Sequence, residues 1–131
     1  MMKLLSLLHK QTNYESLCWY DSRSLPGVRF AVRKASLLQR IELTSRIKEL
    51  ALNHEFLKAG DIPEQLDATM ADLLVRRLYL EWGLDKISGL RIDGDPATLG
   101  SLVERGPETL VEEILAAIKA ELDLSEDERK N

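Results

Sequence analysis

The segment ETLVEEILAAIKAEL, residues 108–122, carries the clearest fold signal in the chain. Its apolar side chains recur at the three- and four-residue spacing of one helix face: Leu110, Val111, Ile114, Leu115, Ile118 and Leu122. Pro107 stands in the favoured first-turn position, and Glu108 complements the helix dipole. The pattern predicts an amphipathic helix over 107–122. Ser125 with the acidic residues after it predicts a separate terminal turn.

Two more long helices are expected upstream. Ser36 and Gln39 have the spacing of a capping box, which predicts a helix from Leu37 to about Leu57 that ends at Gly60. One stripe on this helix is Leu43, Ile47, Leu50 and Leu57, and a second is Leu37, Ile41, Leu52 and Phe56. A helix with two apolar stripes is usually covered on two sides, so we expect neighbours on both.

The other helix is predicted over 65–82 and ends at Gly83. Trp82, at its end, is either a binding anchor or a lid over the core, and the lid is the commoner role for such an indole. The predicted core draws on all three helices: Leu43, Ile47, Leu74, Leu78, Leu110, Ile114 and Ile118.

Between the helices, two segments have strand character. Val28, Phe30 and Val32 alternate with polar or small residues over 28–33, which predicts a half-buried strand. The turn signal Asp93-Gly94 predicts a short hairpin or extended excursion within 84–96, with the 28–33 strand as its candidate partner. A short helix is expected over 99–105. The predicted fold class is therefore mainly α: a small helical domain with three long helices and a short β-strand or hairpin element, plus an N-terminal arm.

The length of 131 residues allows one domain with one core. We expect residues 1–24 to form an N-terminal arm that becomes ordered on docking, and residues 25–131 to form a single helical domain. The arm is rich in apolar side chains: Leu4, Leu5, Leu7, Leu8, Leu17, Trp19 and Tyr20. Its apolar run is too short for a secretory signal, and no segment approaches the roughly 20 apolar residues of a membrane-spanning helix.

Charge is distributed unevenly along the chain. The net charge is −4, but residues 23–58 sum to +5 and residues 59–131 to −9. Such blocks pair within a fold or present two faces to a partner. The basic block lacks interleaved aromatic residues and the isoelectric point is about 5.3, so nucleic-acid binding is not expected.

No catalytic, cofactor or metal site is predicted. The single cysteine, Cys18, excludes an internal disulfide, and no organised base accompanies it in the arm. His9 and His54 are far apart in the sequence, and no glutamate closes a calcium loop around Asp93 and Asp95. The common nucleotide-binding and hydrolase motifs are absent from the sequence. We therefore expect a protein that is not an enzyme.

The order of several short motifs resembles the tail assembly chaperones of long-tailed bacteriophages over about residues 25–131. These motifs are Leu25-Pro26-Gly27-Val28-Arg29-Phe30, Leu80-Glu81-Trp82-Gly83-Leu84, Leu90-Arg91-Ile92-Asp93-Gly94-Asp95-Pro96-Ala97-Thr98, Gly106-Pro107-Glu108, Glu112-Glu113-Ile114, and the closing Leu124-Ser125-Glu126-Asp127-Glu128-Arg129-Lys130-Asn131. The terminal Lys130-Asn131 is the most telling of them.

The resemblance implies a mostly helical, non-enzymatic virion assembly protein in the host bacterial cytoplasm. Such chaperones bind the tape-measure protein, recruit tail-tube subunits and are generally absent from the finished particle. The candidate partner-binding residues are Leu4, Leu5, Leu8, Trp19, Tyr20 and Trp82. Self-association into a homo-oligomer is a competing destination for the same apolar surface.

Two alternatives stay open at this point. The first is a structural or connector component of a phage or phage-like particle, located in the virion. The second is a helical regulatory or adaptor protein without a phage link.

Overall fold

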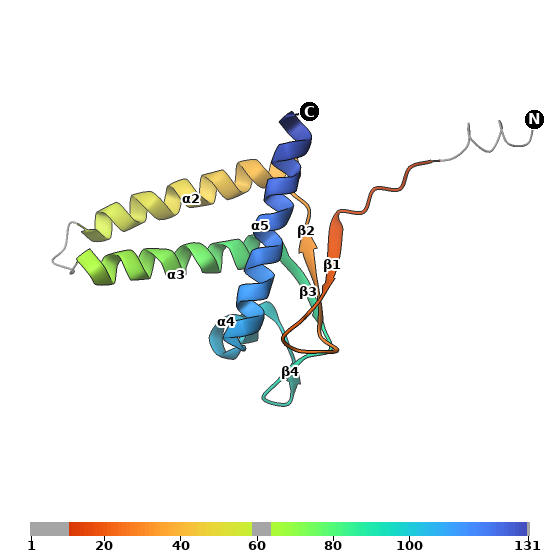
Figure 1. Ribbon diagram of the computed structural model, residues 1–131. Helices are drawn as coiled ribbons and strands as arrows, with labels where there is room; N and C mark the ends of the chain where they lie inside the picture. The colour runs from red at the N-terminus through yellow and green to blue at the C-terminus, as the bar shows by residue number, and fades with distance from the viewer. Residues whose placement is uncertain (1–10, 59–63, 131) are drawn as a thin grey trace, which may run out of the picture.

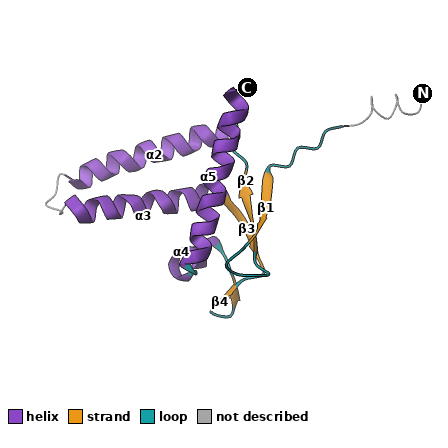
Figure 2. Cartoon of the chain, viewed as in Figure 1, coloured by secondary structure: helices purple, strands orange, loops and turns teal. Residues whose placement is uncertain are grey.

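A computed structural model describes residues 11–58 and 64–130. Within these residues the chain forms four helices and five strands, arranged as a mixed α/β domain (Figures 1 and 2). The elements in order are β1 (Leu17–Asp21), β2 (Arg29–Arg33), α2 (Leu37–Lys58), α3 (Glu64–Gly83), β3 (Leu84–Ser88), β4 (Arg91–Ile92), β5 (Asp95–Pro96), α4 (Leu99–Arg105) and α5 (Glu108–Lys130).

The sheet is antiparallel in the order β1-β2-β3, with β2 in the centre. Phe30, Ala31 and Val32 of β2 are buried because strands cover both edges and α5 contacts the strand. The predicted strand over 28–33 and its pairing with the 84–96 region are confirmed by this sheet. The two-residue strands β4 and β5 form the predicted tight hairpin, in which Asp93 and Gly94 both take positive φ angles.

Helices α2 and α3 run side by side as a hairpin that extends away from the sheet, and α5 crosses its inner end (Figure 1). The inner face of α5 provides much of the core: Leu110, Ile114, Leu115, Ala117 and Ile118 are all buried. Gly83 allows a close approach of α3 to this face, since a Cβ there would lie 2.7 Å from Ile118 Cγ1. The outer part of the hairpin lies beyond α5, and the core therefore sits at its base.

Four of the seven predicted core residues, Leu43, Leu110, Ile114 and Ile118, are buried. The other three, Ile47, Leu74 and Leu78, are only partly buried. All three lie on α2 or α3, where the hairpin leaves the rest of the domain and each helix has chiefly the other to cover it.

The predicted fold class, mainly α, is wrong, because the domain is a mixture of helices and sheet. The largest omission is β1, whose residues lie in the stretch assigned to the N-terminal arm. Leu17–Tyr20 show no polar alternation, and the strand forms because β2 supplies its hydrogen-bonding partner. The arm predicted over 1–24 thus includes a strand that is part of the sheet.

The three long helices fit their predicted ranges only loosely. Helix α5 continues through Ser125 to Lys130 instead of ending before a separate turn, since no Gly or Pro interrupts it. The Ser36–Gln39 capping box is confirmed, with Gln39 N–H donating to Ser36 Oγ at 3.2 Å. The short helix over 99–105 is also confirmed, and Thr98 and Ser101 form its capping box. The predicted helix end at Gly60 lies outside the described residues.

Among the described residues, no helix is long and apolar enough to cross a membrane.

Candidate protein-docking surface

One face of α2 carries four large apolar side chains that are mostly exposed. Leu37, Leu38, Ile41 and Leu52 are between 57% and 70% exposed, and we call these four residues the α2 apolar face. Three of them belong to the second stripe that was predicted to be covered. That prediction is wrong for these residues because α3 packs only on the side of α2 that carries Leu43 and Ile47.

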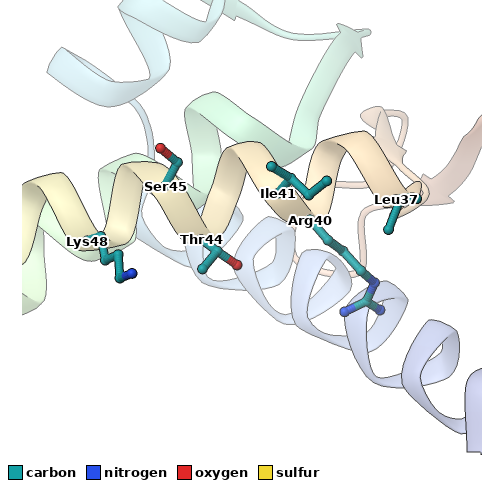
Figure 3. Close-up of a pocket in the computed structure, with 6 residues that line it drawn as sticks. All are labelled: Leu37, Arg40, Ile41, Thr44, Ser45 and Lys48. Atoms are coloured by element: carbon teal, nitrogen blue, oxygen red, sulfur yellow. The ribbon is translucent and has the colours of Figure 1, made fainter.

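A shallow depression of about 450 Å³ runs along this side of α2 (Figure 3). It is lined by Leu37, Arg40, Ile41, Thr44, Ser45 and Lys48. Arg40 points towards α5, where its Nη2 donates a hydrogen bond to the backbone oxygen of Leu122 at 2.9 Å. The surface therefore combines apolar side chains with a positive charge from Lys48.

A second apolar depression, of about 350 Å³, lies where α3, α4 and α5 meet. Its lining includes Leu73, which is 56% exposed, and the buried side chains of Leu80 and Leu102. Arg76 and Arg77 also line it, and they form ion pairs with Glu112 and Glu81, respectively. The two arginines at this site are thus already paired within the chain.

Trp82 is a core residue. Its side chain is only 3% exposed, and its indole N–H donates to the backbone oxygen of Gln39 at 2.9 Å. This bond ties the end of α3 to the first turns of α2, so the lid role is the one the structure shows. Trp82 has no surface available to a partner in this conformation.

The two aromatic residues of β1 point to opposite sides of the sheet. Trp19 is 41% exposed, and the guanidinium of Arg29 lies 5.1 Å from its ring centroid. Tyr20 stacks on Phe30 and donates its hydroxyl to Glu121 on α5 at 2.6 Å. Burial and this bond to Glu121 raise the pKa of Tyr20 above its ordinary value. Only Trp19 of this pair therefore presents substantial surface to a partner.

The remaining candidates, Leu4, Leu5 and Leu8, lie outside the described residues. Cys18 is partly buried, and desolvation together with a hydrogen bond from its side chain to Glu121 raises its pKa. A raised pKa keeps Cys18 in the thiol form, which is the weaker nucleophile. In the part of the chain that the structure describes, no three His, Cys, Asp or Glu side chains gather as a metal site.

The sequence contains a signal for the exposure of the α2 apolar face that was not used in the prediction. Thr44, Ser45 and Lys48 lie between Ile41 and Leu52 on the same side of the helix. Such interruption by polar residues is typical of a surface that contacts water or a partner rather than a core.

Comparisons with models of protein families, with curated proteins and with solved structures found no match to this chain. The candidate surface is therefore defined by the chain's own geometry.

Proposed function

We propose that this protein is a non-enzymatic tail assembly chaperone of a bacteriophage. It acts in the host bacterial cytoplasm and binds the tape-measure or tail-tube protein through the α2 apolar face. The motif order over residues 25–131 supports the family, and the exposure of Leu37, Leu38, Ile41 and Leu52 carries the binding role.

The energetic argument is that exposed apolar side chains gain free energy when a partner covers them. Burial of apolar surface contributes about 25 cal/mol per Å², or roughly 1–2 kcal/mol for a side chain of this size that is already partly covered. A client with long apolar helices aggregates in water unless its apolar stripes are covered. A helix of that kind laid along α2 would cover both surfaces at once.

The charge of Lys48 favours client helices that carry an acidic residue. Lys48 lines the same depression as Ile41 and is itself exposed. A client helix with an acidic residue beside its apolar stripe would place opposite charge near this ammonium. Exposed ion pairs contribute little free energy to binding. The charge of Lys48 therefore orients the client more than it raises the affinity.

Co-expression with each client tests the proposal. The protein is produced together with a tape-measure or tail-tube protein from the same genome, and the soluble fraction of the client is measured. We expect the client to become soluble with the wild-type chain and to stay insoluble with the double variant Ile41→Gln, Leu52→Gln.

The matched control is the double variant Arg46→Gln, Glu49→Gln, which also introduces two glutamines on exposed positions of α2 and conserves the net charge. The control should keep the client soluble. Equal client solubility with and without the protein would refute the chaperone role. Recovery of the protein as a stoichiometric part of purified virions would instead show a structural component.

A further inference from the structure

Strand β1 forms one edge of the sheet, on the side of the domain away from the α2–α3 hairpin (Figures 1 and 2). The backbone N–H of Lys34 donates to the backbone oxygen of Ser16 at 2.9 Å, and the register from there along β1 is unbroken. Backbone groups alternate in direction along a strand, so the even-numbered residues of β1 face β2. The N–H and C=O groups of Leu17, Trp19 and Asp21 therefore point outward, and within the described residues nothing bonds to them.

The two edges of the sheet differ in how they are protected from pairing with another strand. Strand β3, at the other edge, exposes the charged side chains of Asp85 and Lys86, and its register with β2 is interrupted between Ala31 and Val32. Charged residues and such irregularities are the usual protection of an edge strand. Strand β1 has neither, because Leu17–Tyr20 are uncharged and pair with β2 without a break. The unprotected edge is therefore β1.

The outward groups of β1 are complementary to those of a second copy. An antiparallel pairing that sets Trp19 opposite Trp19 of the other chain also sets Leu17 opposite Asp21 and Glu15 opposite Arg23. The three residue pairs within β1 would exchange up to about six hydrogen bonds, two for each pair. The two exposed indoles would form a cross-strand aromatic pair. This register is symmetric, as a two-fold dimer requires.

Charge favours this register over its neighbour. Glu15 and Arg23 are both exposed, and neither side chain has an ion-pair partner within the residues that the structure describes. The symmetric pairing places them opposite each other twice. A register one step further along, centred on Cys18, would instead set Glu15 opposite Asp21, and two acidic side chains in that position repel.

We infer that this protein forms a two-fold symmetric dimer in which β1 pairs antiparallel with β1 of a second copy, centred on Trp19. The two three-stranded sheets then form one sheet of six strands. This inference goes beyond the proposed function, since the contact uses β1 and not the α2 apolar face.

The helices leave room for this pairing. A two-fold axis perpendicular to the sheet puts α5 of both copies on the same face. Helix α5 contacts β2, and the two β2 strands would lie three strand spacings apart, or about 14 Å. Packed helices need only about 8–10 Å between their axes, so the two α5 helices fit side by side.

Sedimentation equilibrium of the full chain tests the inference. The mass should rise with concentration from 14.9 kDa towards twice that value. A single edge contact is smaller than the roughly 1,200 Å² of stable interfaces, so we expect this rise at about 5–500 µM. Trp19→Lys sets two ammonium groups opposite each other and should weaken the dimer at least about tenfold. The matched control Ser88→Lys adds the same charge to an exposed position of β3 and should leave the dissociation constant unchanged.

An exchange of charges tests the register. Glu15→Arg alone, or Arg23→Glu alone, places like charges opposite each other at both ends of the pairing and should raise the dissociation constant about threefold or more. The double variant Glu15→Arg, Arg23→Glu restores opposite charges and should return the constant to within about twofold of wild type. This rescue keeps the inference testable even if Trp19→Lys fails to fold, which circular dichroism would reveal.

Four results would overturn the inference. A monomer over the whole concentration range would show that a second copy does not occupy the edge. A dimer that Ser88→Lys disrupts would be joined through β3, and one that Ile41→Gln with Leu52→Gln disrupts would be joined through the α2 apolar face. Lack of rescue in the exchanged variant would exclude this register. No client enters these measurements, so their failure and that of the client-solubility experiment are distinguishable.

Discussion

The backbone N–H of Ser24 donates to Oε1 of Glu113 at 2.9 Å, across 89 residues of sequence. The same carboxylate accepts from the backbone N–H of Arg23 at 2.8 Å and from the hydroxyls of Ser22 and Ser24. One side chain of α5 thus holds the first three residues that follow β1.

Replacement of Glu113 by Gln should destabilise the domain by about 1 kcal/mol at pH 7. Hydrogen bonds to a charged acceptor are worth about 1.5–3 kcal/mol when buried, and the solvent near this turn reduces the figure. Chemical denaturation followed by circular dichroism measures the change. The neighbouring change Glu112→Gln is the control, since Glu112 makes only a surface ion pair with Arg76 and should cost less than about 0.5 kcal/mol.

The contribution of Glu113 should depend on pH in a defined direction. The Ser24 hydroxyl, then the Arg23 and Ser24 backbone N–H groups, lower its pKa from 4.5 to about 2. A lowered pKa in the folded state means that the stabilisation is complete above pH 4.5 and is lost as the pH falls towards 2. The difference in unfolding free energy between wild type and Glu113→Gln should shrink across that window. A difference that stays constant down to pH 2 would contradict the assignment.

Tyr20→Phe should cost about 0.5–1.5 kcal/mol, since it removes the hydrogen bond to Glu121 and keeps the stacking on Phe30. The raised pKa of Tyr20 gives a second readout. Stabilisation from a group with a raised pKa is complete below its ordinary value near 10 and is lost at higher pH. Wild type should therefore lose its advantage over Tyr20→Phe only above about pH 10, and an advantage lost below pH 9 would argue against the bond.

Local patterns in the sequence predicted the elements that depend on near neighbours. The capping box at Ser36, the short helix over 99–105 and the turn at Asp93-Gly94 are each decided by a few adjacent residues, and all three were predicted. Strand β1 was missed because its partner, β2, lies beyond a seven-residue connection and its own residues do not alternate. Pairing between segments, rather than propensity, decides such a strand.

The apolar stripes of a helix do not by themselves show which of its faces other elements bury. Leu43 and Leu52 both lie on apolar stripes of α2, yet the first is buried and the second is exposed. The difference arises because α3 packs only on the side of α2 that carries Leu43, and this packing is a property of the tertiary fold. Tertiary packing also made Trp82 a core residue instead of a binding residue.

A pair of identical substitutions measures this difference in coverage. Leu110→Ala removes a fully buried side chain on α5 and should cost about 2–5 kcal/mol from lost transfer energy and the cavity left behind. Leu52→Ala removes an exposed one and should cost less than about 0.5 kcal/mol. Thermal or urea unfolding of both variants gives the comparison. A loss of 2 kcal/mol or more for Leu52→Ala would show that another part of the protein covers this position.

Gly89, which follows β3, and Gly94, in the turn between β4 and β5, offer a last test of the fold. Both have positive φ, so an alanine at either position should cost about 1–2 kcal/mol in backbone strain. At Gly94 a Cβ would meet nothing within 4 Å, but at Gly89 it would clash with the backbone oxygen of Gly27.

Gly89→Ala must therefore also push apart the turn after β3 and the turn before β2. We expect it to cost at least about 1 kcal/mol more than Gly94→Ala in urea unfolding, in the range of other backbone clashes. Because the turn that holds Gly27 also carries the residues bound by Glu113, Gly89→Ala should reduce the effect of Glu113→Gln in the double variant. Strictly additive losses would show that the two contacts do not share this turn.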